Sequence, residues 1–352
     1  MAHPIGQFRR WWTRVTHFEY WPFNVFYFPV HFYYAWLALR SRSLFFFTAS
    51  NPSIEFGGMM GEKKSEIFDL IPSAFIPQTK LFPPEVTTND VLAFMEGQEI
   101  QFPIIAKPDV GERGWMVAKL KSVEEVRAYL DTIQVDFLIQ EFIDLPVELG
   151  VFYVKIPGQP QGRVTSIVRK GFMSVTGDGK HTVRQLLEND IRAMLQVDFN
   201  NPAISEVLDD IPASGEVHIV ESIGNHCRGT TFLDFNHWID ADLNEAFNQI
   251  SDQIKDFYFG RFDLRCQSIE DLRQIKNFKI LELNGAGAEP GHIYQPGRSI
   301  LLAYRDVLWH LKMLRQVSAA NRKRGHPYWA FSQGWKKWKE VNHYNRRKKP
   351  TE

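Results

Sequence analysis

A carboxylate and an amide side chain two residues apart could together bind a metal ion. Residues 279–291 read KILELNGAGAEPG, and the alternation of apolar and polar residues in the first half predicts a strand with one buried face. On this period Glu282 and Asn284 project to the same side, and a turn containing Gly287 follows. Carboxylate and amide oxygens are hard donors that suit Mg²⁺, which usually keeps phosphate and water as its other ligands.

A second predicted strand supplies a further carboxylate. Residues 260–265, GRFDLR, place Arg261, Asp263 and Arg265 on one face by the same alternation. A single acidic residue on a strand is more often a solvated surface residue than a ligand. However, the matching pattern on two strands favours a shared site: if the strands pair, Asp263 joins the carboxylate and amide of the later strand beside two guanidinium groups. The sequence therefore predicts a site for a metal-bound polyphosphate.

A lysine followed by a glycine-rich loop is the second candidate for phosphate binding. Residues 103–120, PIIAKPDVGERGWMVAKL, predict a strand, a loop and another strand. Lys107 ends the first strand, and Gly111 and Gly114 lie in a loop flexible enough to close over phosphates. The P-loop pattern GxxxxGK[ST] is absent from the sequence, so a different mode of nucleotide binding is expected.

The order of these motifs resembles the ATP-grasp superfamily, whose members include D-alanine–D-alanine ligase and cyanophycin synthetase. The resemblance covers roughly residues 60–312. It implies an α+β fold in which two α/β lobes clasp ATP, preceded by a short N-terminal lobe and an aromatic N-terminal arm. The segment GDGKHTVRQLL, residues 177–187, is also similar to a segment of cyanophycin synthetase and its relatives.

The resemblance also implies roles for nucleotide-binding residues. Glu141, Phe142 and Ile143 follow an apolar strand and would line adenine, while Glu148 would hold the ribose hydroxyls. Lys170 matches the position of another phosphate-contacting lysine.

Further positions would border the triphosphate and the acyl acceptor. Asn225 and Arg228 resemble the loop that does so in these enzymes, together with Gly287. Near the N-terminus, Gly57, Gly58 and Gly61 precede a helical pattern and predict a seat for a substrate carboxylate or phosphate, because a helix N-terminus attracts anions.

The implied reaction is the ATP-dependent joining of a carboxylate to an amine. The carboxylate attacks the γ-phosphorus, which gives an acyl phosphate and ADP, and the amine then displaces phosphate. Mg²⁺ or Mn²⁺ on Asp263, Glu282 and Asn284 would bridge the phosphates, and Arg261 and Arg265 would stabilise the phosphoryl group and the oxyanion. Glu282→Gln and Asp263→Asn are expected to stop turnover while the fold stays intact.

Two other functions are alternatives to the ligase. The same site could phosphorylate a small-molecule hydroxyl, as some members of the superfamily do, or the chain could be a non-catalytic, membrane-associated nucleotide-binding module. The expected substrate lobe, residues 43–90, is too short for a D-alanine specificity to be assigned. Within it, residues 43–50, SLFFFTAS, form an apolar run of strand length.

Both ends of the chain are basic and aromatic. Residues 1–42 contain five arginines and one glutamate, and residues 315–352 contain eleven lysines and arginines and two glutamates, although the formal net charge is zero. The aromatic segment 21–39 is interrupted by Pro22 and Pro29, so contact with an anionic membrane surface is expected. The alternatives are packing, homodimerisation or a transmembrane span. Nucleic acid is not an expected partner.

The chain is therefore expected to divide into four segments: an arm (1–42), a small N-terminal substrate lobe (43–90), an ATP-grasp domain of two lobes (91–314) and a basic tail (315–352). Its two cysteines, Cys227 and Cys266, predict buried thiols in a reducing compartment, and the residues beside Cys227 form no metal motif. With no cleavable signal peptide expected, the protein is predicted to be cytoplasmic, at the inner face of the cytoplasmic membrane.

Overall fold

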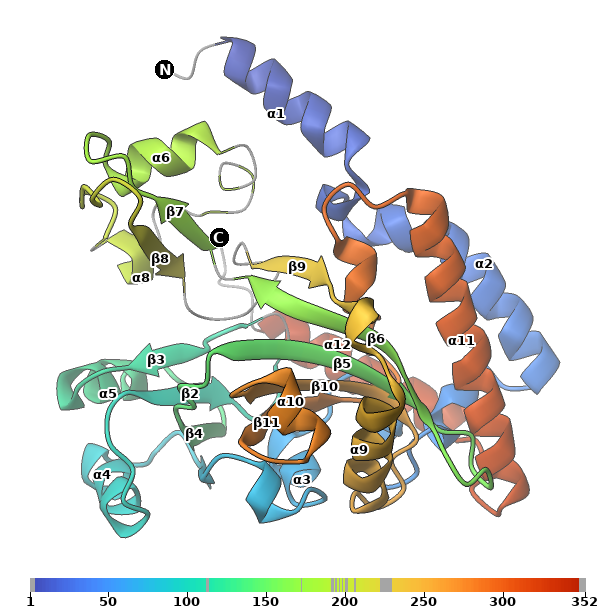
Figure 1. Cartoon of the computed structure of the whole chain (residues 1–352). Coiled ribbons are helices and arrows are strands. Elements are labelled where there is room, and N and C mark those ends of the chain that lie inside the picture. Colours follow the sequence, from blue (N-terminus) through green and yellow to red (C-terminus); the bar gives the residue numbers. More distant parts are fainter. Residues whose placement is uncertain are drawn as a thin grey trace.

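The fold combines antiparallel sheets with helices that cover them (Figure 1), in agreement with the expected α+β class. The structure is a computed structural model, in which the described residues are 4–111, 114–171, 173–190, 193, 195, 197, 199, 202–205, 207–221 and 230–347.

The first large sheet has four antiparallel strands. Its order is β1 (Thr79–Phe82), β4 (Phe137–Glu141), β2 (Ile104–Pro108) and β3 (Ala118–Leu120). Two helices pack on it, α4 (Thr88–Gly97) and α5 (Val123–Leu130), and their fully buried Val91 and Val126 share a core with Phe137 of the sheet. Strand β1 comes from the segment expected to be a separate N-terminal lobe, residues 43–90, yet it pairs with β4. The boundary predicted at residue 90 therefore does not separate β1 from the rest of this sheet.

The second large sheet has five antiparallel strands and is buried on both faces. Its order is β11 (Phe278–Asn284), β10 (Phe259–Cys266), β5 (Val147–Val154), β6 (Arg163–Gly171) and β9 (Thr231–Asp234). One face packs on α3 (Lys64–Phe68), α9 (Ala241–Asp252) and α10 (Ile269–Arg273), and the other on α11 (Ile300–Lys323) and the 3-10 helix η2 (Phe46–Ala49). Because both faces are covered, β10 and β5 are buried almost throughout.

A small unit with its own core separates β6 from β9 in the chain. It contains β7 (Met173–Thr176), α6 (Val183–Asn189), α8 (Pro202–Ser205) and β8 (Val217–Glu221). These elements form a group of their own in Figure 1. The GDGKHTVRQLL segment forms the turn into α6, where Thr182 and Gln185 make a reciprocal capping box, so its structural role is to start this helix.

Helices from both ends of the chain pack on the five-stranded sheet side of the molecule: the 3-10 helix η1 (Phe18–Tyr20), α2 (Phe23–Ser41) and α12 (Phe331–Arg347). The first helix, α1 (Pro4–Thr16), projects away from the body (Figure 1). Helix α2 continues through Pro29 and lies along α11, where Phe26 stacks on Tyr304 with 5.0 Å between ring centroids (Figure 1). Within the described ranges, no helix combines the length and the apolar character needed to cross a membrane.

The apolar run 43–50 is not a strand. It forms η2, whose four residues are all buried and belong partly to the core between α2, α11 and β5. Because consecutive side chains are buried in different directions, the segment lacks the alternation that a half-buried strand requires.

The glycines at 57 and 58 serve close backbone packing, which corrects the expectation of an anion seat. Both have positive φ angles, +65° and +73°, and their carbonyls accept the backbone N–H groups of Ala286 and Gly287 at 3.0 and 2.8 Å. The turn therefore fastens the segment after β11, and Gly287 takes part in this packing rather than in a phosphate loop.

The helix after these glycines already has a carboxylate at its N-terminus. The backbone N–H and hydroxyl of Ser65 donate to the two oxygens of Asp109 at 2.8 and 3.0 Å. A carboxylate at this end satisfies the unpaired N–H groups of the first turn. The anion at this position is thus part of the chain, which is the physical reason that the expected substrate seat is wrong.

The glycine packing predicts a large loss of stability for Gly58→Ala. A Cβ at residue 58 would lie 2.7 Å from the Cα of Gly285, and the positive φ adds strain. We expect a loss of about 2–4 kcal/mol in the free energy of unfolding, measured by urea denaturation. Gly97→Ala is the control, since nothing lies within 4 Å of its Cβ position; an equal loss there would contradict this interpretation.

Candidate active site

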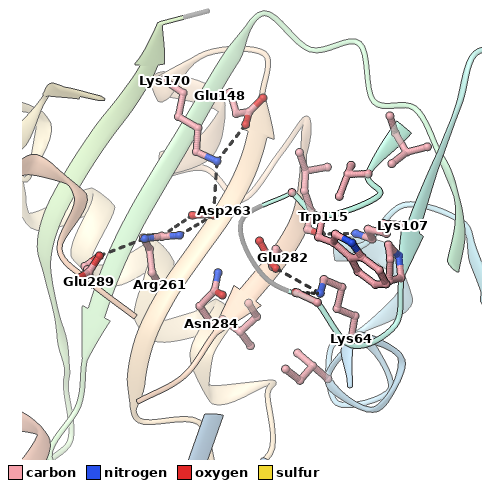
Figure 2. Close-up of a pocket in the computed structure, with 18 of the residues that line it drawn as sticks. Lys64, Lys107, Trp115, Glu148, Lys170, Arg261, Asp263, Glu282, Asn284 and Glu289 are labelled. Atoms are coloured by element: carbon pink, nitrogen blue, oxygen red, sulfur yellow. Dashed lines mark hydrogen bonds and ion pairs between the residues drawn. The ribbon is translucent and has the colours of Figure 1, made fainter. Parts of the chain in front are cut away.

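The two late strands pair as the sequence predicts. In the antiparallel pair β10–β11, Asp263 lies opposite Glu282 and Arg261 lies opposite Asn284, with an irregularity after Asp263. Directly opposed residues share one face of the sheet. The acidic, amide and guanidinium groups are therefore brought together, as Figure 2 shows.

These residues face a cavity of about 520 Å³. Its walls come from both large sheets, the loop after β2 and the N-terminal arm. The predicted site residues that line it are Lys107, Gly111, Gly114, Glu141, Phe142, Ile143, Glu148, Lys170, Arg261, Asp263, Arg265, Glu282 and Asn284. Asn225, Arg228 and Cys227 lie outside the described residues.

Asp263 is held by two cations. It is buried, and Arg261 donates from Nε and Nη2 to its two oxygens at 2.7 and 3.0 Å, while Lys170 Nζ lies 3.5 Å from Oδ2. Burial alone would raise the pKa of Asp263, but Arg261 and Lys170 outweigh it and hold that pKa below its usual value. Burial opposes the charge of Lys170 as well, yet Asp263 and Glu148 raise the pKa of Lys170.

Glu282 and Asn284 make fewer interactions within the protein than Asp263 does. The Glu282 side chain is 38% exposed, and its ion pair with Lys64 is long, 4.0 Å. Among the described residues, the buried Asn284 Nδ2 finds no hydrogen-bond partner. A buried N–H donor without a partner is costly unless a ligand acceptor, such as a phosphate oxygen, satisfies it. The amide oxygen of Asn284 and the carboxylate oxygens of Glu282 are the atoms that suit Mg²⁺.

Asp263, Glu282 and Asn284 therefore fit one divalent cation, provided that Asp263 can release a bond to Arg261. In the part of the chain that the structure describes, no three His, Cys, Asp or Glu residues form a metal cluster, so the amide of Asn284 is needed as the third ligand. Both oxygens of Asp263 now accept bonds from Arg261. Asp263 must share or exchange this partner to contact a metal ion.

Lys107 connects the two large sheets at the cavity floor. From β2 it donates to Gln140 Oε1 and to the carbonyl of Leu281 in β11, both at 3.0 Å, and it lies 4.9 Å from the Phe68 ring centroid. Burial lowers the pKa of Lys107 to about 7. A polyphosphate in the cavity would favour the charged form and restore a higher pKa.

This depressed pKa predicts proton uptake when nucleotide binds. At pH 8, above the folded pKa of about 7, Lys107 is mostly neutral in the free protein, and binding of ATP should add close to one proton. Titration calorimetry in buffers of different ionisation enthalpy measures this number. Lys107→Met should remove the uptake and lower the affinity for ATP; an unchanged uptake would mean that another group takes the proton.

The same pKa shift has a consequence for the free protein. Because the unfolded chain binds more protons at Lys107 than the folded one between about pH 7 and its ordinary pKa of 10.5, this residue makes stability rise with pH across that window. The contribution of neutral Lys107 to the free energy of unfolding is complete above pH 10.5 and is lost as the pH falls to about 7.

The segment after β4, Glu141–Ile143, is called the hinge below, and together with Glu148 it takes a different arrangement from the one the resemblance implies. Both oxygens of Glu148 are bound within the protein, one by Arg265 Nε at 2.9 Å and the other by Lys170 Nζ at 3.1 Å. Arg265 Nη1 also donates to the carbonyl of Ile143 at 2.7 Å, and its guanidinium lies over the Phe142 ring. Arg265 thus ties β10 to the hinge, which corrects its expected position beside Arg261 at the phosphoryl group.

Several residues that line the cavity or contact its glycine-rich loop were not predicted. Lys64 Nζ donates to the carbonyl of Gly111 at 2.7 Å and so supports the glycine-rich loop; its sequence neighbourhood carries no distinguishing signal. Glu289 follows the turn after β11, and its carbonyl accepts from Arg261 Nη1 at 3.3 Å. From the tail, Tyr344 donates to the carbonyl of Val110 at 3.0 Å, so α12 also contacts this loop.

The N-terminal arm forms one wall of the cavity, whereas the sequence predicted that it contacts a membrane surface. Phe18, Glu19, Trp21, Phe23 and Phe26 all line the cavity. Their aromatic character was the available signal, because packing on the body was one of the alternatives for this segment.

Comparisons with known proteins give structural neighbours only. No family model and no curated protein matches the sequence significantly. Among similar solved structures is the D-alanine–D-alanine ligase of Bacillus anthracis, which is 14% identical with a TM-score of 0.42, over 75% of this chain and 68% of that one; the same enzyme is also known complexed with ATP.

Two further neighbours are ligases or synthetases by name. The VanG D-Ala:D-Ser ligase of Enterococcus faecalis is 14% identical with a TM-score of 0.38, over 74% of this chain and 62% of that one. The bifunctional glutathione synthetase of Pasteurella multocida is 14% identical with a TM-score of 0.39, over 71% of this chain and 35% of that one. The chain thus spans about a third of the latter. A D-alanine–D-alanine ligase, an enzyme named in the motif resemblance of the sequence, is thus among these neighbours.

Proposed function

We propose that this protein is an ATP- and Mg²⁺-dependent ligase that joins a carboxylate to an amine through an acyl phosphate. The observation that carries the proposal is the convergence of Asp263, Glu282 and Asn284 from paired strands on one cavity, with Lys170 beside Asp263 and Lys107 contributed by the other large sheet. Carboxylate and amide oxygens facing buried lysines match the charge pattern of a metal-bound triphosphate. The four- and five-stranded sheets would be the two lobes that clasp ATP between them.

Each residue of this site has a task in positioning and charge neutralisation. Lys107 and Lys170 bind phosphate oxygens as point charges, and Arg261 turns from Asp263 toward the transferred phosphoryl group. Mg²⁺, when bound by Asp263, Glu282 and Asn284, neutralises charge on the phosphate oxygens. Once Arg261 and Asp263 have exchanged partners on binding of nucleotide and metal, the groups are held in place and need no further reorganisation as charge develops, which is the main source of rate enhancement expected here.

The nucleotide base would lie at the other end of the cavity. The ring of Phe142, the hinge at Glu141 and Ile143 and the carboxylate of Glu148 line this part. Glu148 would accept the ribose hydroxyls only by giving up one bond, from Arg265 or from Lys170. The buried cluster of Glu148, Lys170 and Arg265 therefore links ribose binding to phosphate binding.

The chemistry proceeds in two displacements. A carboxylate oxygen of the first substrate bonds to the γ-phosphorus while the bond to the β–γ bridging oxygen breaks and ADP leaves. The amine nitrogen of the second substrate then bonds to the acyl carbon, loses its proton and expels inorganic phosphate. Arg261 is the residue placed to stabilise the oxyanion that forms at the acyl carbon.

The test is ADP release with a panel of carboxylic acids in the presence of MgATP. Acid-dependent ADP release that increases with an amine, and trapping of the acyl phosphate by hydroxylamine as a hydroxamate, are the expected results. ADP release driven by a hydroxyl compound without any acid would identify a kinase instead. A protein that binds ATP but releases no ADP with any substrate pair would contradict the ligase assignment.

A further inference from the structure

The outward face of α2 is apolar along the length of the helix. Val25, Phe28, Phe32, Trp36 and Leu39 recur at intervals of three and four residues, so they lie on one side. Each is 46% to 77% exposed. Single exposed apolar residues need no explanation, but a continuous stripe of this kind marks an interaction surface.

The opposite side of α2 is already occupied by the protein. Phe26, Val30 and Leu37 are 2% to 4% exposed and belong to cores shared with α11 and its neighbours. A helix that is apolar on both sides is normally surrounded by apolar material. The outward stripe therefore requires a second apolar phase, which the chain itself does not supply among the described residues.

The charges around the stripe distinguish a membrane from a second copy of the chain. Arg14, Arg40 and Arg42 are exposed, and the one acidic residue of segment 1–42, Glu19, is 7% exposed. A symmetric dimer would bring this basic rim against itself. An anionic bilayer surface complements it, with arginines at the lipid headgroups and aromatic rings at the interface.

The same arm forms the rim of the catalytic cavity. Phe23 lines the cavity, is 46% exposed, and stacks on Tyr27 with ring centroids 4.3 Å apart. It lies at the start of the helix that carries the stripe. By helical spacing Phe23 lies on the side of α2 that carries Phe26 and Tyr27, opposite the stripe. The cavity therefore opens at the N-terminal end of α2 and not beneath the stripe.

The arm end of the cavity also has its own chemistry. Glu19 of the arm and Glu289 line this cavity together with the aromatic rings of Phe18 and Trp21. Carboxylates and aromatic faces attract a cationic amine, whereas the β10–β11 end, with Lys107 and Lys170, attracts anions. An ammonium head on an apolar body matches this end.

We propose that the outward face of α2 binds an anionic bilayer surface and that the amine substrate is an amphiphile delivered from this bilayer into the cavity past Phe23. The claim about the substrate rests on the proposed ligase function, whereas the claim about membrane binding does not.

Vesicle sedimentation of the full chain without nucleotide tests membrane binding. We expect binding to vesicles of phosphatidylglycerol and phosphatidylcholine, weak binding to phosphatidylcholine alone, and an at least tenfold weaker partition for the Phe28→Glu/Phe32→Glu double variant. Val217→Glu in β8 is the matched control, because Val217 is 64% exposed, and it should bind as wild type does.

Two results would overturn the membrane claim. One is equal vesicle binding by the double variant. The other is a wild-type dimer in analytical ultracentrifugation that the double variant dissociates, without vesicle binding, since a second copy would then be the occupant of the stripe.

ADP release tests the substrate. With an active acid, phosphatidylethanolamine in anionic vesicles should support at least tenfold faster release than the same concentration of free ethanolamine. The double variant should lose this gain and the Val217→Glu control should keep it, with melting temperatures measured for both. Equal rates with lipid and free amine would overturn the amphiphile claim while leaving the ligase intact. If no pair of acid and amine supports ADP release, both the ligase function and the amphiphile claim are overturned, while the sedimentation result stands.

Discussion

Replacing Glu282 with glutamine should lower turnover about 10³-fold or more and leave the protein as stable as the wild type. The side chain is 38% exposed and its ion pair with Lys64 spans 4.0 Å. Exposed pairs of this length contribute about 0–1 kcal/mol to stability, so the fold depends little on the charge. A metal ion, in contrast, loses a charged ligand that an amide of the same shape does not replace.

The measurement combines initial rates of ADP release with urea denaturation of the same preparations. Glu270→Gln is the matched control, since Glu270 is 70% exposed, pairs with Arg273 at 3.6 Å and lies away from the cavity. Turnover by Glu282→Gln close to that of wild type would show that Glu282 is not a metal ligand. A large loss of stability would show instead that the residue is structural.

The position of these residues was predictable because a strand has a period of two. Alternation alone placed Glu282 and Asn284 on one face and Asp263 on the face of the neighbouring strand, and the observed register sets Asp263 opposite Glu282. The short connection between the two strands, residues 267–277, contains only the helix α10 and leaves antiparallel pairing as the simple solution. Convergence of the site therefore followed from local rules.

The partners of the charged groups were not predictable in this way. Arg265 shares its face of β10 with Arg261 and Asp263, but which acceptor it meets depends on β5, where Glu148 lies directly opposite it. That neighbour is more than a hundred residues away in sequence, and no local pattern distinguishes it from other carboxylates. The expected phosphoryl role of Arg265 was wrong for this reason.

Glycine-rich turns were ambiguous for a different reason. A glycine permits a positive φ and a close approach, but the sequence does not state whether the approaching group is a ligand or the chain itself. At Gly58 the approaching group is Gly285, whose Cα would lie 2.7 Å from an added Cβ. The arm raised the same ambiguity, because aromatic residues serve equally well in a membrane interface and in a cavity wall, and here Phe23 lines the cavity.

Asp263→Asn should both stop turnover and destabilise the fold, which departs from the expectation that the fold would stay intact. The carboxylate is 5% exposed and forms two hydrogen bonds to Arg261 with Lys170 close by. Removing its charge leaves the partly buried guanidinium of Arg261 without its nearest counter-charge, with only the more distant Glu282 and Glu289 in its surroundings, at a cost of about 3 kcal/mol. Since Arg261 and Lys170 lower the pKa of Asp263, the stabilisation is present above the ordinary pKa and is lost as the pH falls through the folded value.

A double variant separates the two effects of Asp263. In Arg261→Met/Asp263→Asn no guanidinium is left unpaired, so about half of the lost stability or more should return, with a coupling of at least 1 kcal/mol between the two sites. Turnover should not return, because neither a metal-binding carboxylate nor Arg261 is present. Urea denaturation of the wild type, both single variants and the double variant gives the coupling. Additive losses would show that the pair contributes nothing, and would leave binding of metal and phosphate as the sole reason for Asp263 and Arg261 to lie together.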